Sequence, residues 1–461
     1  MRWLTGVFLI ALVAGACGSA APDPQASDLA VLVDQNPDPG VVEVELVAAP
    51  GMVELLADKP ADVWAFRDGS DPDATGSVPG PMLQADVGSQ VIVHFRNDLP
   101  DATTIHWHGL RVPNAADGTP AAQVPVPPGG SYDYVFTVRE PGLYWYHPHI
   151  AADVQIERGL YAPIVVRGGV APDVAADRVF VLDDVKLEAS GQLSTTTDGL
   201  DIMLGRQGNV VLVNGRRRPA IAAAAGSRER WRFVDTANGR YFRLALAGHP
   251  FRVIGWDGGP LRAPYLTDSL LIAPGERYDV LVELDGDEGE TLVLQNLYYD
   301  RGHDIPDAGP LDLLDVRLGG AGPAPAPLPA VWGEVEPIGV DATTPHRALV
   351  LAETEGAEPT FSINGERYPD ITAVAVTDGA VEIWDLRNDA EMDHPFHLHG
   401  TEFQLVGDGP PLGWKDTVNV PRRSDVSIAV RFDALGRWMY HCHILEHAER
   451  GMMGEIAVSR P

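Results

Sequence analysis

Hydrophobic and polar residues alternate in short segments through most of the chain, and glycine and proline separate these segments. Alternation with a period of two is clear at residues 90–95, 132–138, 278–282 and 426–432. Because successive side chains of a β-strand point to opposite faces, this pattern predicts half-buried strands. A helical period is not sustained over three turns outside Ala-rich connections. The pattern therefore predicts an all-β chain built from β-sandwiches.

One template recurs along the chain. Its first and last copies share the order Gly, strand, Asn and His, with twenty residues from the Gly to the His: Gly88, Asn97 and His108 in one, Gly379, Asn388 and His399 in the other. A middle copy keeps the 35-residue interval from an Asn-Gly pair to a histidine, since Asn214 precedes His249 as Asn364 precedes His399. Such self-similarity predicts three related structural units.

The middle copy of the template differs from the other two in the motif at its end. Gly142 precedes His147 by five residues and Gly436 precedes His441 by five, whereas the middle copy reads GETLVLQN and has no histidine there. Gly/Pro-rich joins lie near residues 168–173 and 319–329. We therefore expect domains at 41–168, 174–318 and 335–461, and we expect the second to hold no metal.

The first forty residues have a different character. An apolar run from Trp3 to Ala16 is too short to span a bilayer and predicts an export signal at 1–16, with a polar tether at 17–40. Cys17 follows small residues typical of a lipoprotein cleavage site, so it is expected either to carry lipid and anchor the protein in a membrane or to be removed with the signal. We expect an exported protein, periplasmic or on the cell surface.

Composition limits the classes of partner that the protein can bind. The 461 residues include 65 acidic and 34 basic side chains, a net charge of −31, which disfavours nucleic acid as a partner because phosphate needs Lys and Arg to neutralise it. The two cysteines, Cys17 and Cys442, offer no disulfide framework. Nothing in the sequence predicts assembly, and we expect a monomer.

Histidine is strongly clustered. Ten of the fourteen histidines fall in four short motifs: His106-Trp107-His108, His147-Pro148-His149, the segment with His394, His397 and His399, and His441-Cys442-His443 with His447. A His-x-His pair on a strand points two imidazoles to one side, as convergent metal binding needs. The other four, His94, His249, His303 and His346, match no ligand spacing, and we interpret them as structural.

Cys442 lies between two histidines of one strand, so its thiol points away from both imidazoles and two metal sites share the strand. His394 has the opposite parity to His397 and His399, and it joins Cys442 and His447. With Met452 as a weak axial thioether, this set has the ligand chemistry of a blue copper site. The remaining eight imidazoles suit three further copper ions.

Other chemistries fit less well. A structural zinc ion takes four closed ligands, not twelve in two groups linked through one cysteine. No H-E-x-x-H, G-x-S-x-G or Gly-rich phosphate loop is present, so metalloprotease, hydrolase and nucleotide-binding functions have no support.

At these motifs the chain resembles the multicopper oxidases, the group of laccases, copper-efflux oxidases and spore-coat oxidases. The resemblance implies three tandem cupredoxin-like Greek-key β-sandwiches and four copper ions in each chain. It places His394, Cys442, His447 and Met452 at type 1 copper and His106 and His397 at type 2. The type 3 pair would take His108, His147, His149, His399, His441 and His443. A methionine axial ligand resembles the bacterial members and implies a lower reduction potential.

The implied activity couples four one-electron oxidations of a small reductant to the reduction of O2 to two waters. Phenols, aromatic amines and Cu(I) all stay open as reductants, although eight methionines without a Met-rich cluster argue against a dedicated cuprous oxidase. Asp117 and Glu446 lie where bacterial relatives place proton-relay carboxylates, and either could instead orient a ligand. The alternative function is a non-catalytic exported scaffold of the same fold.

Overall fold

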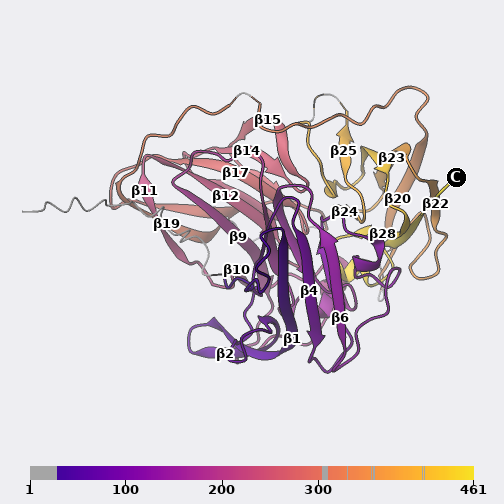
Figure 1. The fold of residues 1–461 in the computed structure, drawn as a ribbon, viewed down its shortest axis with the longest axis horizontal. Coiled ribbons are helices and arrows are strands. Elements are labelled where there is room, and N and C mark those ends of the chain that lie inside the picture. Colours follow the sequence, from indigo (N-terminus) through magenta and orange to yellow (C-terminus); the bar gives the residue numbers. More distant parts are fainter. Residues whose placement is uncertain are drawn as a thin grey trace, which may run out of the picture.

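The computed structural model describes residues 29–303, 310–329, 331–354, 356, 359–407, 409 and 411–461. The expected export signal, Cys17 and the tether as far as residue 28 lie outside the described residues. Three pairs of β-sheets follow one another along the chain (Figure 1). The described helices are short, and none has the length and apolar character of a membrane span.

The first unit consists of two four-stranded sheets, ordered β2-β1-β4-β6 and β3-β8-β7-β5. In β4, buried Val91, Val93 and Phe95 alternate with more exposed residues, as the sequence pattern predicts. The strands are β1 (Val41–Leu56), β2 (Lys59–Asp68), β3 (Leu83–Asp86), β4 (Gln90–Asn97), β5 (His106–His108), β6 (Ser131–Thr137), β7 (Gly142–His147) and β8 (Ala162–Arg167). Two short helices accompany them: the 3₁₀ helix η1 (Asn114–Ala116) and α1 (Ala152–Gln155).

The middle unit has a six-stranded sheet, β10-β9-β12-β17-β14-β15, and a five-stranded sheet, β11-β19-β18-β13-β16. Its helix α2 (Gly199–Leu204) begins at Asp198 with a capping box. The strands are β9 (Ala176–Val185), β10 (Val210–Val213), β11 (Ala220–Ala225), β12 (Ser227–Asp235), β13 (Phe242–Leu246), β14 (Phe251–Trp256), β15 (Gly259–Thr267), β16 (Leu270–Ile272), β17 (Arg277–Leu284), β18 (Thr291–Leu297) and β19 (Leu311–Ala321).

The last unit has two five-stranded sheets, β21-β20-β23-β27-β25 and β22-β29-β28-β24-β26. The strands are β20 (His346–Thr354), β21 (Thr360–Ile363), β22 (Val374–Thr377), β23 (Ala380–Asn388), β24 (His394–Leu398), β25 (Phe403–Val406), β26 (Thr417–Val420), β27 (Ser424–Phe432), β28 (Gly436–Cys442) and β29 (Met453–Ser459). A single turn of helix, α3 (Leu445–Ala448), follows β28.

The three units repeat one pairing scheme, which confirms the all-β prediction. In each, a first strand lies parallel to a central strand that pairs antiparallel with a third: β1-β4-β6, β9-β12-β17 and β20-β23-β27. Asn97 and Asn388 end equivalent strands, and each side-chain amide donates to two backbone carbonyls, one four residues on and one more distant. The repeated asparagine of the sequence template thus marks the same turn in both units.

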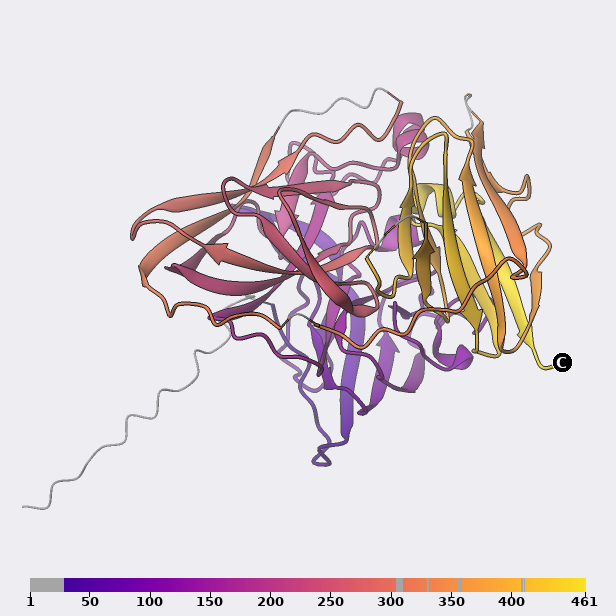
Figure 2. The same cartoon turned by 90° about the horizontal axis from the view of Figure 1, so that it is seen from above.

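The first and last units lie side by side, with the middle unit next to both (Figure 2). Arg111 of the first unit donates to both carboxylate oxygens of Asp433 at 2.7 and 2.8 Å, and Asn114 Nδ2 donates to the carbonyl of Arg437 at 2.6 Å. These contacts join the first unit, near η1, to the segment between β27 and β28 of the last unit and to the start of β28.

Candidate metal centres

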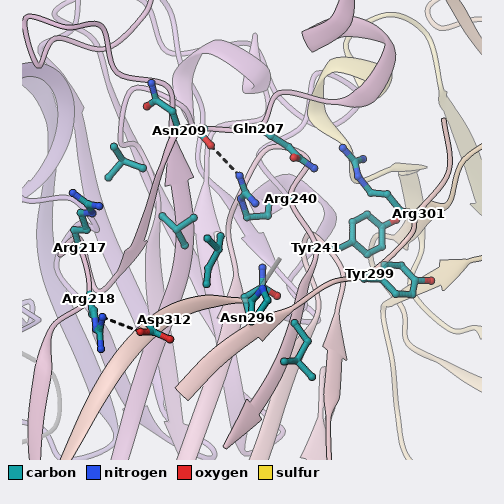
Figure 3. Close-up of a pocket in the computed structure, with 16 residues that line it drawn as sticks. Gln207, Asn209, Arg217, Arg218, Arg240, Tyr241, Asn296, Tyr299, Arg301 and Asp312 are labelled. Atoms are coloured by element: carbon teal, nitrogen blue, oxygen red, sulfur yellow. Dashed lines mark hydrogen bonds and ion pairs between the residues drawn. The ribbon is translucent and has the colours of Figure 1, made fainter. Parts of the chain in front are cut away.

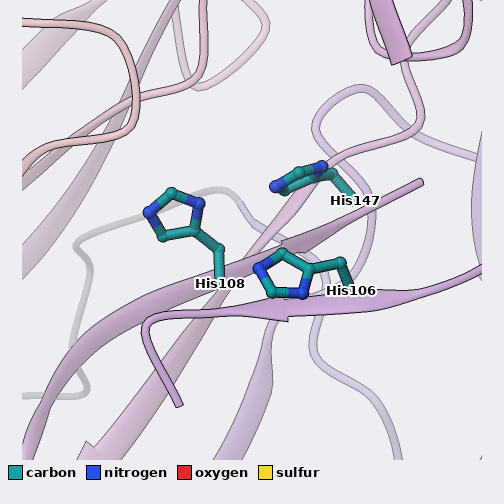
Figure 4. Close-up of side chains that lie close together, drawn as sticks. All are labelled: His106, His108 and His147. Carbon is teal, nitrogen blue, oxygen red and sulfur yellow. The ribbon is translucent and has the colours of Figure 1, made fainter. Parts of the chain in front are cut away.

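Histidines face one another across two antiparallel strand pairs. His106 lies opposite His147 in the β5/β7 pair, and His397 lies opposite His441 in the β24/β28 pair. Figure 4 shows the rings of His106, His108 and His147 converging from β5 and β7. The contact between the first and last units brings these two groups of histidines together, since the ring centroids of His106 and His399 are 4.0 Å apart. Residues nearly 300 positions apart therefore share one buried cluster.

This eight-histidine cluster is defined by the imidazoles that the first and last units contribute: His106, His108, His147, His149, His397, His399, His441 and His443. All eight are buried. His441 Nε2 lies 3.1 Å from His399 Nε2 and 3.3 Å from His149 Nε2. Three triplets of ring nitrogens close enough to share an ion can be drawn within it: His106, His108 and His147; His106, His397 and His399; His149, His399 and His441.

Backbone carbonyls orient half of these rings. The Nδ1 atoms of His106, His147, His397 and His441 donate to the carbonyls of Asp117, Pro148, Asp416 and Cys442, at 2.8 to 2.9 Å. The opposite nitrogens are left without a proton and aimed into the cluster. The Nε2 atoms of His106, His147 and His397 are buried and have no hydrogen-bond partner in the described part of the chain. Buried acceptors of this kind fit metal ligation.

Burial favours the neutral form of six of these rings. It lowers the pKa of His108, His147, His399, His441 and His443 well below the ordinary value, and neighbouring imidazoles lower it further. The pKa of His149 falls to about 3 for the same reason. Neutral imidazole is the form that binds metal, so the cluster is preorganised for cations at neutral pH.

A second, smaller site surrounds Cys442. Its Sγ lies 3.5 Å from His394 Nδ1 and 3.8 Å from His447 Nδ1, and these two nitrogens are 3.2 Å apart. Met452 is fully buried in the same core cluster as Cys442. Burial raises the pKa of the Cys442 thiol, so it stays protonated unless a metal ion displaces the proton. Its donor set of thiol, imidazole and thioether suits a soft ion such as copper.

The partners of the two imidazoles in this site were not predicted from the sequence. His447 Nε2 donates to the carbonyl of Met203, at the end of α2, and its ring stacks on Phe361 at 3.9 Å. His394 Nε2 lies 3.6 Å from Glu353 Oε2. Burial alone would raise the pKa of Glu353, but His394, His303 and the Glu391 N–H lower it, so a buried carboxylate faces this site.

The two predicted relay carboxylates have different surroundings. Asp117 contacts the eight-histidine cluster, with His399 Nδ1 3.2 Å from its Oδ2. Although burial would raise its pKa, His399 and His106 hold that pKa well below the usual range. Glu446 instead accepts hydrogen bonds from Asn238 Nδ2 at 2.8 Å and from the Arg206 N–H at 3.0 Å, and burial raises its pKa to about 7. The hydrogen bonds of its side chain thus run to the middle unit rather than to an imidazole.

Asp416 is a site residue that the sequence reasoning missed. It stands immediately before β26, and its Oδ1 accepts a hydrogen bond from His108 Nε2 at 3.2 Å. Its side chain also forms a bidentate pair with Arg277 of β17, and both residues are buried. No spacing pattern marks Asp416, because its side chain meets His108 and Arg277 of the other two units as well as His397 of its own unit, 3.4 Å away.

The four remaining histidines lie outside the described metal triplets. His94 pairs with Glu43 and Asp133, His346 with Asp385, and both nitrogens of His249 contact backbone carbonyls. His303 forms an ion pair with Glu353, and the same carboxylate also lies beside His394. It is therefore nearer to a candidate site than its spacing indicated.

Comparisons with known proteins agree with this architecture. Three multicopper oxidase family models match residues 73–170, 183–303 and 340–461. The chain is 33% identical to the multicopper oxidase MmcO of Mycobacterium tuberculosis over 82% of this chain and 81% of that one. Its fold is similar to that of multicopper oxidases from Campylobacter jejuni (TM-score 0.83, 27% identity, 93% and 94% of the two chains) and Pediococcus acidilactici (0.82, 31%, 95% and 91%).

Fold, histidine clusters and relatives point to one conclusion. The buried imidazoles fit copper, and the all-β units correspond to the cupredoxin-like domains of the solved relatives. The chain belongs to the multicopper oxidase family, whose members are copper-dependent oxidoreductases that oxidise small molecules with O2.

Proposed function

We propose that His394, Cys442, His447 and Met452 hold type 1 copper in the last unit. In this proposal the eight-histidine cluster holds the other three ions: His106 and His397 bind type 2 copper, and His108, His147, His149, His399, His441 and His443 bind the type 3 pair. When bound, copper would supply one-electron oxidation of the donor at the first site and reduction of O2 at the second. The protein fixes ring orientation, excludes water and moves protons.

One observation carries the assignment: the alternation of side chains on β28 and just beyond it. Cys442 points to His394 and His447, while His441 points to His149 and His399 on the other side. His443 also lies on that side, with its ring centroid 4.9 Å from that of His108. The two sites are therefore joined by adjacent residues of one covalent chain.

We also propose that Asp117 and Glu446 relay protons to the cluster. Asp117 is supported by its contacts with His106 and His399. Glu446 is supported by its burial and by its position next to His447, although its bonds to Asn238 and Arg206 equally suit a residue that fastens α3 to the middle unit.

The test of the metal assignment is copper content combined with the visible spectrum. The copper-loaded protein should be blue, because thiolate bound to Cu(II) absorbs strongly in the red. Cys442→Ser should remove the colour and the oxidation of phenols while the cluster keeps its copper. His249→Gln, at a histidine that bonds to the carbonyls of Ala247 and Asp285 and belongs to neither site, is the matched control and should stay blue. A fully loaded wild-type protein without this absorption band would overturn the type 1 assignment.

The reductant is proposed to be a small phenol, an aromatic amine or Cu(I). Steady-state kinetics on a panel of these donors would rank them by kcat/KM. A copper-loaded protein that oxidises none of them, with O2 present, would favour the non-catalytic scaffold instead.

The support for export and for membrane anchoring comes from the first forty residues alone. We propose an exported monomer held at a membrane by lipid on Cys17, because the apolar run before it is typical of an export signal. Wild-type protein should then partition with membranes and Cys17→Ala should not. A mature N-terminus beyond Cys17 would show that the cysteine is removed.

A further inference from the structure

A cavity of about 520 Å³ opens on the middle unit, next to the last unit (Figure 3). Its charged lining residues are four arginines, Arg217, Arg218, Arg240 and Arg301, and one aspartate, Asp312. A positive cavity is unexpected in a chain whose net charge is −31. The volume lies within the range of small-molecule sites.

Arg301 is the buried one among these four arginines. Its side chain is only 2% exposed, and its Nη1 has no hydrogen-bond partner among the described residues. The Gln207 amide oxygen, in the orientation that satisfies both groups, accepts from its Nη2 at 2.9 Å and from its Nε at 3.3 Å. No carboxylate of the described chain forms an ion pair with it. Asp184 and Asp393 attract it from nearby without forming an ion pair. A buried cation that is only partly neutralised is costly, so an anion brought into the cavity gains a partner there.

The other arginines differ in how far they are neutralised. Arg218 pairs with Asp312 at 2.8 Å, and Arg240 pairs with Asp184 while donating to the carbonyl of Gly208. Arg217 is exposed and makes no ion pair within the described part of the chain. Charge left over at Arg217 and Arg301 therefore makes the cavity positive at both ends.

Two tyrosines, Tyr241 and Tyr299, form an aromatic wall of the cavity, and Tyr241 belongs to the same hydrophobic core cluster as Cys442. Tyr241 and Tyr299 stack with ring centroids 5.8 Å apart, and Arg301 lies over Tyr241 at 5.6 Å. The Tyr299 hydroxyl donates to Asp393 at 2.6 Å, and the Asp393 N–H donates to the carbonyl of Arg301 at 2.8 Å. Asp393 directly precedes His394. The wall is thus bonded to the segment that carries one of the proposed type 1 ligands.

We propose that this cavity binds the electron donor, and that the preferred donors are aromatic carboxylates bearing a phenolic hydroxyl. The carboxylate pairs with Arg301 and the ring packs against Tyr241 and Tyr299. This inference rests on the proposed function and adds the charge class of the donor. The positive lining disfavours Cu(I) at the same place by repulsion.

The proposed oxidation of the phenol balances with O2 as the electron acceptor. Each phenolic hydroxyl loses one electron and its proton and becomes a phenoxyl radical, while the carboxylate is unchanged. Four such donors release four electrons and four protons. One O2 takes up both and becomes two waters.

The kinetic test compares two donors that differ by one carboxylate, 4-hydroxy-3,5-dimethoxybenzoate and 2,6-dimethoxyphenol. Arg301→Gln should raise KM for the benzoate about 10–100-fold, the range for a lost charged hydrogen bond. KM for the neutral phenol should not change. Arg301→Lys should recover part of the loss, and the exposed Arg167→Gln is the matched control. An equal rise in KM for both donors would overturn the proposal.

A binding measurement separates this site from turnover. Benzoate has no phenolic hydroxyl, so its binding to the copper-loaded protein can be followed by calorimetry under argon. Arg301→Gln should abolish that binding, and Arg217→Gln, which removes only an exposed side chain, should weaken it about two- to fivefold. Benzoate binding without oxidation of any phenol would refute the proposed oxidase donors and keep the anion site. Wild-type protein that does not bind benzoate would refute the anion site.

Discussion

The two candidate metal centres differ in how many parts of the fold they need. The Cys442 site is built by one sandwich: His394 comes from β24, Cys442 from β28 and His447 from α3. The eight-histidine cluster takes four imidazoles from the first unit and four from the last. All ligands of the first site therefore belong to the last unit, although the Met203 carbonyl of the middle unit orients His447, whereas the second site exists only when two units dock correctly.

The middle unit contributes no histidine to the cluster, yet it helps to hold the docked arrangement. Arg277 of β17 donates to both oxygens of Asp416 in the last unit, and its Nε donates to the carbonyl of Leu143 in the first. Asp416 in turn accepts from His108. One buried guanidinium thus contacts all three units beside the cluster.

The largest expected effect comes from breaking this link. Arg277→Met leaves Asp416 as a buried, unpaired carboxylate, and removing one partner of a buried pair costs about 3–5 kcal/mol in the free energy of unfolding. We expect the cluster to lose copper while the blue Cys442 site persists, measured by copper analysis, spectrum and denaturant unfolding. Arg96→Met, which breaks an exposed pair with Asp98, is the control and should cost under about 1 kcal/mol. Loss of the blue band before the cluster copper would contradict the comparison.

The next effect distinguishes proton delivery from structural support. Glu446→Gln keeps the shape of the side chain, so both centres should stay loaded and reduction by the donor should stay fast. If Glu446 delivers protons, reoxidation by O2 should slow by about 10²–10⁴, as for a lost general acid. Stopped-flow mixing of the reduced variant with O2 measures this step. Glu449→Gln, a partly buried neighbour bonded to the Ala152 N–H, should reoxidise normally.

A normal rate in fully loaded Glu446→Gln would remove this residue from the relay. Copper loss or an altered blue band would instead show that Glu446 mainly positions α3 against the middle unit.

The smallest effect is confined to the Cys442 site. The Glu353 carboxylate faces His394, and a nearby negative charge stabilises Cu(II) over Cu(I). Glu353→Gln should raise the reduction potential of this site by roughly 50–100 mV, since such a charge is worth about 1–2 kcal/mol at an effective dielectric constant near 20. Spectroelectrochemical titration of the blue band measures it, with Glu366→Gln, a partly exposed residue bonded to Thr372, as control. A change in cluster copper would show that the two centres are less separate than the fold indicates.

Much of this architecture was predictable because it is local. Strand alternation at β4 and β27, and the template linking Gly88 with Gly379, follow from side-chain period and turn chemistry. The opposite directions of His441 and Cys442 follow from the same period of two, and the structure places both as expected.

The rest depends on contacts between units, and no spacing rule carries that information. Asp416 and Arg277 are 139 residues apart, and Glu353 reaches His394 from a separate strand. Arg301 could be proposed as a contact for the electron donor only from the structure, which shows its burial and its unpaired Nη1. Sequence reasoning finds ligands that repeat on one strand, and it misses groups that reach them from elsewhere.

The carbonyls that orient His106, His147, His397, His441 and His447 have a consequence for mutagenesis. These acceptors belong to the main chain, so no exchange of one side chain for another deletes them. An alanine scan would leave these five hydrogen-bond acceptors in place and would assign their contribution to the histidines themselves. Backbone ester substitution at the acceptor residues, which weakens the carbonyl without touching any ring, is the change that would reveal it.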